Sequence, residues 1–119
     1  MRSFLCAGTA VWLIAAPVSA FAAGAIAVDL EAGRTPETVG YGHSSGFSSR
    51  DQAGAAALAE CRRRGNANCK LRVRFDVCGA FAVSPQTSSG GWGNSDRAAR
   101  AAALNQCGAG CQIVVAVCD

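Results

Sequence analysis

Short runs of alternating apolar residues predict β-strands at four places in the chain. The sequence GAIAV at 24–28 returns as GAFAV at 79–83, and both runs alternate alanine with a large apolar residue. Apolar residues also occupy every second position of 71–75 and 113–117. A period of two residues is typical of a strand whose two faces differ in burial. The glycine-rich stretches that follow the first two runs favour turns.

Two alanine-rich segments have the period of a helix instead. Their small residues are spaced i, i+3, i+4 and i+8, at Ala53, Ala56, Ala57 and Cys61 and again at Ala99, Ala102, Ala103 and Cys107. This spacing places them on one helix face. A face built of methyl groups lets a helix lie close to a sheet or to a second helix.

The ends of both helices carry recognisable signals. Ser49 and Ser95 are predicted N-caps, with Gln52 positioned to close a capping box on Ser49. Gly65 and Gly108 follow the last periodic residues, where glycine commonly ends a helix.

An internal repeat organises these elements into two modules. Residues 49–61 align without a gap with 95–107, and GYG at 40–42 aligns with GWG at 91–93. The first copy is longer by an insertion at 29–38 and by four residues between its first two cysteines. We predict one α+β domain over 24–118, built of two tandem ββαβ modules, 24–78 and 79–118. We expect pseudo-twofold symmetry to relate the two modules. The domain is expected to contain an antiparallel sheet, two alanine-rich helices and stabilising disulfides.

The first twenty residues have the pattern of an export signal. Arg2 is followed by an apolar run at 4–16 and by small residues up to Ala20. We expect cleavage after Ala20, with Ala22 and Ala23 as alternatives. An uncleaved anchor is disfavoured because the run is shorter than the roughly 20 residues that a bilayer requires. The mature protein is therefore expected to be secreted or periplasmic, without a membrane span.

The remaining composition predicts cross-links. Residues 21–119 hold only 20 large apolar side chains beside 20 alanines and six cysteines. Burial of one large side chain contributes roughly 1.5–3 kcal/mol, whereas ordering a residue costs about 1.5 kcal/mol. Disulfides persist outside the cytosol and would compensate for so small a core.

Six cysteines permit fifteen pairings, and the sequence alone does not choose rigorously among them. The repeat favours Cys61 with Cys69, Cys107 with Cys111, and Cys78 with Cys118. A zinc site is disfavoured because no Cys-x-x-Cys pair occurs and His43 is the single histidine. We expect neither a metal nor another cofactor.

The doubled pattern resembles a known family. The GAIAV and GAFAV runs, the Gly-aromatic-Gly triplets, the serine-started helices ending in cysteine and the closing Val-Cys strand resemble the bacterial secreted family catalogued as domain of unknown function 4189. The resemblance covers about residues 24–118. It implies a small exported α+β domain and carries no catalytic residues over to this chain.

No motif of the chain predicts catalysis. His43 can be combined with Ser44 or Ser45 and with Asp29, Asp51 or Asp76, but no nucleophile elbow is present. Cys61 and Cys107 lie at helix ends rather than helix starts, so redox chemistry is also disfavoured. We expect a protein without enzymatic activity.

The basic residues cluster in one module. Six of the eleven cations fall within thirteen residues, at Arg62, Arg63, Arg64, Lys70, Arg72 and Arg74. The arginines at 62–64 follow a helix end, where the dipole favours positive charge. Strand alternation predicts that the cations at 70, 72 and 74 share one face. The six form a candidate anion-binding strip, and the alternative is a solvated strand face beside a helix-end charge cluster.

Tyr41 and Trp92, each between two glycines, form a second candidate pair. They are candidate stacking platforms for sugar rings. The alternative is that each ring packs over the bare glycine backbone of a neighbouring strand.

These observations favour an exported, non-enzymatic binding or interaction protein of the cell envelope or extracellular space. Its expected contact is an anionic surface or polymer at the basic strip. The alternative is a secreted effector or inhibitor that binds a protein through the insertion at 29–38, and a hydrolase is a distant third. A net charge of +3 and export disfavour a nucleic-acid partner. We expect a monomer.

Overall fold

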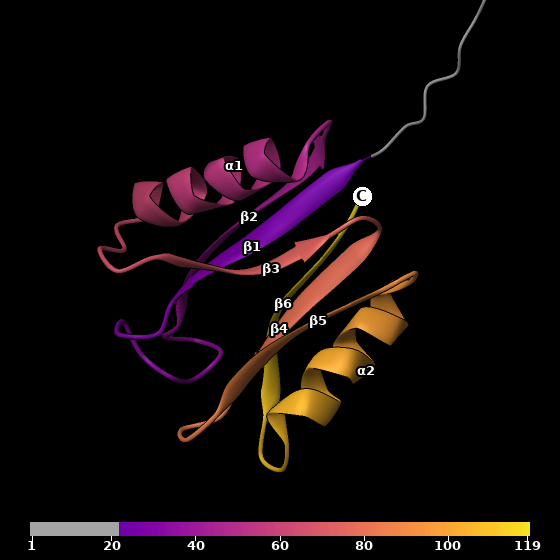
Figure 1. Ribbon diagram of the computed structural model, residues 1–119. Helices are drawn as coiled ribbons and strands as arrows, with labels where there is room; N and C mark the ends of the chain where they lie inside the picture. Colours follow the sequence, from indigo (N-terminus) through magenta and orange to yellow (C-terminus); the bar gives the residue numbers. More distant parts are fainter. Residues whose placement is uncertain (1–21) are drawn as a thin grey trace, which may run out of the picture.

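A computed structural model describes residues 22–119 (Figure 1). The predicted signal peptide, residues 1–20, lies outside the described residues. The described chain runs strand, strand, helix, strand twice in succession. The elements of the first module are β1 Ala23–Asp29, β2 Gly40–Phe47, α1 Arg50–Arg63 and β3 Lys70–Phe75. Those of the second are β4 Cys78–Val83, β5 Ser88–Gly93, α2 Asp96–Cys107 and β6 Gln112–Cys118. Cys78, which the repeat assigned to the end of module one, therefore begins the first strand of module two.

Each module forms its own antiparallel sheet. The strand orders are β2-β1-β3 and β5-β4-β6, so the first strand of each module is central and the other two are edges. The predicted α+β class with two ββαβ modules is confirmed. The single antiparallel sheet that was predicted is instead two sheets, one in each module.

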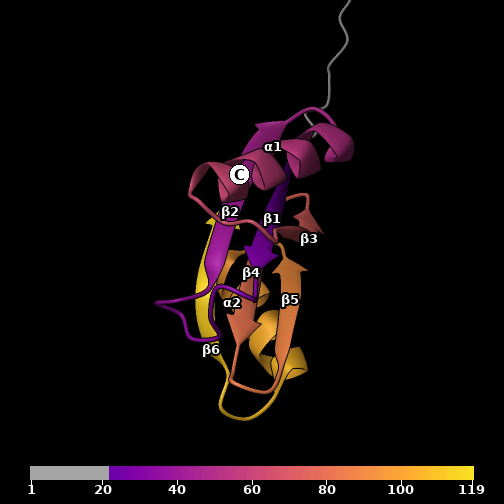
Figure 2. The same cartoon turned by 90° about the vertical axis from the view of Figure 1, so that its left-hand side faces the viewer.

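The molecule has four layers, with the sheets stacked face to face and the helices on the two outer faces (Figures 1 and 2). The main core lies between the sheets. It consists of buried residues from both modules: Ile26, Val28, Val39, Val73, Phe75, Phe81 and Val83.

The alternation of small and large residues has a direct structural meaning. In β1 the alanines Ala23, Ala25 and Ala27 pack against α1. In β4 the small residues Cys78, Ala80 and Ala82 pack against α2. The large residues of both strands point the other way, into the core between the sheets. Each central strand therefore presents a flat face to its helix and a bulky face to the opposite module.

The helices lie very close to their sheets. A Cβ atom added to Gly42 would lie 2.2 Å from the Cys61 backbone nitrogen, and one added to Gly91 would lie 2.3 Å from the Ala103 nitrogen. Real Cβ atoms do not approach backbone so closely, so glycine is required at both positions. Of the two neighbours predicted for the alanine faces, each helix packs on its own sheet.

The predicted helix caps are confirmed, with one difference. The Ser49 and Ser95 hydroxyls accept hydrogen bonds from the backbone N–H groups of Gln52 and Ala98. The Gln52 side chain does not close the predicted box on Ser49. Its Oε1 instead accepts a 3.1 Å hydrogen bond from Ser48 Oγ, because the preceding serine offers a hydroxyl donor. Gly65 follows the first helix with a φ of +95°, a conformation that favours glycine.

The three predicted disulfides are confirmed. Cys61–Cys69 and Cys107–Cys111 join the end of each helix to the strand that follows. Cys78–Cys118 joins β4 to β6, whose first and last residues are partners in the strand ladder.

One aromatic side chain joins the modules. A Cβ added to Gly24 or to Gly79 would lie 2.3 Å from the ring of Phe75. The ring therefore occupies the space that these two glycines leave open, one in the central strand of each module. Phe75 is 1 % exposed and belongs to the shared core.

Candidate functional site

The six basic residues do not form one continuous strip. In β3, Val73 pairs with Ile26 and Leu71 pairs with Ala27, so Arg72 is an extra residue in the ladder. Such a bulge reverses the facing of the residues beyond it. Arg74 pairs with Ala25 on the α1 side, whereas Lys70 pairs with Val28 on the side of the opposite sheet. The expectation that Lys70, Arg72 and Arg74 share one face is therefore wrong.

Four of the cations lie on two chain segments that meet at one end of module one. The Cys61–Cys69 disulfide holds the two Cα atoms 6.2 Å apart, which brings the end of α1 beside the start of β3. We call this group the basic end; it comprises Arg62, Arg63, Arg64 and Lys70. All four residues are exposed.

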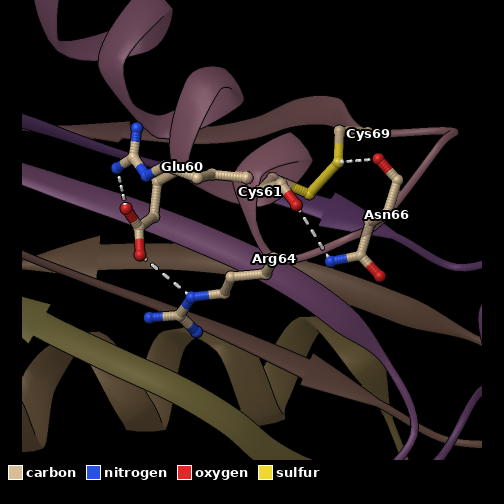
Figure 3. A network of polar contacts seen from close by, with 6 residues as sticks. Glu60, Cys61, Arg64, Asn66 and Cys69 are labelled. Carbon is tan, nitrogen blue, oxygen red and sulfur yellow. Dashed lines mark hydrogen bonds and ion pairs between the residues drawn. A yellow bond between two sulfur atoms is a disulfide. The ribbon is translucent and has the colours of Figure 1, made fainter.

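Polar contacts fix the shape of the basic end (Figure 3). Glu60 forms ion pairs with Arg63 and, at 3.0 Å, with Arg64 Nε. The Arg64 guanidinium also lies 4.8 Å from the centre of the Tyr41 ring, a cation–π contact. Asn66 donates a 3.0 Å hydrogen bond from Nδ2 to the Cys61 carbonyl and so caps the helix end.

Charge at this end affects the titration of Glu60. Hydrogen bonds donated by Arg64 and Arg63 lower the pKa of its carboxyl below 4.5. Glu60 therefore stays ionised at neutral pH and compensates part of the positive charge of the four cations, through its ion pairs with Arg63 and Arg64. Of the roles considered for Tyr41, the structure shows a third: its ring packs against the Arg64 guanidinium.

A cleft of about 400 Å³ opens at the opposite end of the sheets, between the modules. Trp92, at the end of β5, lines it and is 64 % exposed. Arg74, the last cation of the predicted strip, lines it together with Arg50 at the start of α1 and Asp76 in the β3–β4 turn. The structure thus separates Arg74 from the basic end and places it beside the predicted aromatic residue.

Ion pairs hold the polar wall of this cleft. Arg50 Nη2 donates to both carboxylate oxygens of Asp76, at 3.1 and 3.2 Å. Arg74 Nη1 lies 3.8 Å from Asp51 Oδ1, a looser pair at the outer edge. No sequence motif links Arg50 to Asp76, which was considered only as an acid partner for His43. The two residues are 26 positions apart, and only the tertiary structure brings them together.

Tyr41 and Trp92 are not equivalent, contrary to the alignment of the two glycine triplets. Tyr41 pairs with Val28 in β1, whereas Trp92 pairs with Gly79 in β4. Val28 is near the end of its strand and Gly79 is near the start, so the rings lie at opposite ends of the two sheets. The glycines misled the alignment because both hairpins need small residues beneath a helix, at different registers.

The histidine and the candidate acids have other partners. His43 is exposed on β2, and its ring stacks on Tyr41 with centroids 6.4 Å apart. The Ser44 hydroxyl donates a 2.6 Å hydrogen bond to the Ala53 carbonyl. Asp29 accepts hydrogen bonds from three backbone N–H groups, those of Glu31, Ala32 and Asn68.

The insertion at 29–38 is tied to the second module. Arg34 Nε donates to the carbonyl oxygens of Pro85, at 2.9 Å, and Ser84, at 3.3 Å. Leu30 packs against the shared core from the start of the loop. The insertion therefore bridges the two modules at the end of the molecule that also holds the basic end.

Two further findings concern residues 22–119. No helix in this part of the chain is long and apolar enough to cross a membrane. Within the same residues, no group of three or more His, Cys, Asp or Glu side chains is placed to hold a metal ion.

Comparison with known proteins identifies a solved structure with a similar fold and a protein family. No curated protein matches the chain. The chain is similar to the NMR structure of Rv1813c from Mycobacterium tuberculosis, with a TM-score of 0.57 and 24 % sequence identity. The similarity covers 98 % of this chain and 97 % of that one, and it shows a common fold. The model of a domain of unknown function, DUF4189, matches residues 23–118, and the chain therefore belongs to that family.

Proposed function

We propose that the protein is an exported, non-enzymatic binding protein of the cell envelope or extracellular space. Its basic end contacts phosphate or carboxylate groups of an anionic surface or polymer. The N-terminal pattern of residues 1–20 and the three disulfides support export, since disulfides persist mainly in oxidising compartments.

One observation carries the binding proposal: the cations accompany only one of two otherwise similar helix-end disulfides. The Cys61–Cys69 clamp encloses the arginines at 62–64, whereas Cys107–Cys111 encloses Gly108, Ala109 and Gly110. The last turn of α2 also has no basic residue. The fold therefore forms this clamp without positive charge, and the charge of module one is available for another role.

The geometry of the basic end suits a flat or extended anionic partner. Glu60 and Tyr41 orient Arg63 and Arg64, which limits the conformational entropy that binding must remove. Arg62 and Lys70 lie on adjoining segments and are exposed. Glu31 and Glu37 are exposed acidic residues of the insertion, which begins at the same end of the molecule.

The alternative of a protein partner bound by the insertion at 29–38 receives less support. Arg34 and Leu30 give the insertion a structural role in joining the modules. That role accounts for a longer loop in module one without a partner.

The test compares two variants with the same change in net charge. Arg62→Glu with Lys70→Glu reverses charge at the basic end, and Arg97→Glu with Arg100→Glu does so on α2. Binding of the mature protein, residues 21–119 with its disulfides intact, to phosphatidylglycerol vesicles and to polygalacturonate is measured at increasing salt. The two probes distinguish a lipid surface from an acidic polymer.

We expect the basic-end variant to bind at least one probe about tenfold more weakly or worse, since each basic residue near an anionic surface contributes about 1 kcal/mol. The α2 variant should bind nearly as the wild type does, and salt should weaken all binding. Equal losses in both variants, or no binding to either probe, would refute a localised site.

A further inference from the structure

Trp92 is an exposed aromatic residue that the fold does not require. It is 64 % exposed, although tryptophan is usually largely buried. Ala25 of β1 and Ala80 of β4 are equivalent positions of the two central strands. Ala25 pairs with Ser44 of β2, and Ala80 pairs with Gly91 of β5. The position after Gly91 is Trp92, whereas the position after Ser44 is a serine. The two modules share a fold although only the second has a tryptophan here, so the shared fold does not depend on this side chain.

The cleft gives the ring a ligand-sized space. Directly paired residues of antiparallel strands point to the same face of a sheet. Trp92 of β5 pairs with Gly79 of β4, so it points to the face of the sheet on which Gly79 contacts the Phe75 ring. The cleft volume of about 400 Å³ falls within the range of small-ligand sites. One wall is apolar, formed by Trp92 and the half-exposed Val77, and the other carries Arg50, Arg74 and Asp76.

The charges of the polar wall identify the chemistry of the ligand. Two guanidinium groups and one carboxylate line the cleft, and Asp51 pairs with Arg74 at its edge. The signs nearly balance, so neither a strong anion nor a strong cation is favoured. A guanidinium only donates hydrogen bonds and a carboxylate only accepts them, whereas a hydroxyl does both. A ligand with several hydroxyl groups can therefore use both halves of the Arg50–Asp76 pair.

We propose that this cleft binds one ring of a neutral oligosaccharide. The apolar face of the sugar stacks on Trp92, and its hydroxyl groups bond to Arg50, Asp76 and the Asn94 side chain on the rim. Arg50 Nη2 donates hydrogen bonds to both carboxylate oxygens of Asp76, which holds the two side chains in place before the sugar arrives. This site is separate from the basic end and does not depend on the function proposed for it.

The test uses the mature protein, residues 21–119, and four neutral hexasaccharides, of glucose, mannose, xylose and N-acetylglucosamine. Binding is measured by calorimetric titration and by the NMR shift of the Trp92 indole N–H. We expect at least one probe to bind and Trp92→Ala to weaken it by about tenfold or more, with partial recovery in Trp92→Phe. Because the ring is mostly exposed, the melting temperature of Trp92→Ala should stay near that of the wild type.

Further arms separate this site from the basic end. Sugar binding should persist at high salt, because stacking and hydroxyl hydrogen bonds are weakly screened. The Arg62→Glu, Lys70→Glu variant should keep sugar binding, and Trp92→Ala should keep binding to anionic probes. The proposal is overturned if no hexasaccharide binds, if Trp92→Ala binds equally well, or if Trp92 proves to contact a protein instead.

Discussion

Glycine and alanine residues set the distance between helix and sheet in both modules. Gly42 and Gly91 lie beneath backbone atoms of α1 and α2, and alanines fill the remaining contact face. Such contacts bury little apolar area for each residue but permit dense packing. The small residues therefore support the helices through close approach rather than through bulk.

Replacement of Gly42 by alanine should destabilise the protein. The new Cβ would lie 2.2 Å from the Cys61 nitrogen, and this backbone cannot rotate away as a side chain can. Overpacking of this kind costs about 1–3 kcal/mol, which chemical denaturation would detect. Ser45→Ala, at an exposed position of the same strand, is the matched control. Equal stability of the two variants would show that α1 moves away freely.

The equivalent edge strands of the two modules, β3 and β6, differ in charge. The β3 edge carries Lys70, Arg72 and Arg74, and charged side chains discourage pairing of an exposed edge with another chain. The bulge at Arg72 recurs in β6, where the register shifts between Phe81 and Ala82. A bulge in both third strands turns the first residues of each strand away from the face of the later ones. Edge protection thus accounts for Arg72, whereas Lys70 joins the arginines after α1.

The ion pairs of Glu60 predict a pH dependence at the end of α1. Hydrogen bonds from Arg64 and Arg63 lower the pKa of Glu60 in the folded protein. Their stabilising effect is therefore fully present above the pKa of the unfolded chain and is lost as the pH falls through the lower folded value. Wild type should melt slightly above Glu60→Gln at neutral pH, and the gap should close as the pH falls below 4.5.

The measurement is thermal unfolding of both proteins over a pH series. Glu37→Gln, at an exposed position of the insertion, is a suitable control for the loss of one negative charge. A melting-temperature gap that stays constant down to the lowest pH would contradict the role of these ion pairs.

The whole molecule is held together by a core that neither module completes alone. Phe75 from module one fits against Gly24 of its own sheet and Gly79 of the other. Arg34 adds hydrogen bonds from the insertion to the β4–β5 turn. A backbone N–H of β2, that of Gly46, also donates to the carboxylate of Asp119 beyond β6. The two modules should therefore unfold as one unit.

Phe75→Ala should lower the stability of both modules together, by about 3–5 kcal/mol, because it leaves a cavity in the shared core. Hydrogen exchange would show protection falling in β1 and β4 in parallel. Val77→Ala, at a residue 41 % exposed, should change protection little. A variant in which one module alone lost protection would show that the modules fold independently.

The sequence by itself determined the elements and their order. Alternation in GAIAV and GAFAV, the serine caps and the alanine faces are local patterns, and local backbone chemistry follows them. The repeat also predicted the three disulfides, since equivalent cysteines must occupy equivalent places.

The tertiary structure alone decided which side chains meet. One extra residue in β3 separated Lys70 from Arg74, and a shifted hairpin register separated Tyr41 from Trp92. Both displacements depend on pairing between strands, which a single segment does not encode. The cleft likewise forms where α1, the β3–β4 turn and β5 come together, so its residues share no local pattern. Sequence periodicity specifies the face of an element, whereas packing between elements specifies the site.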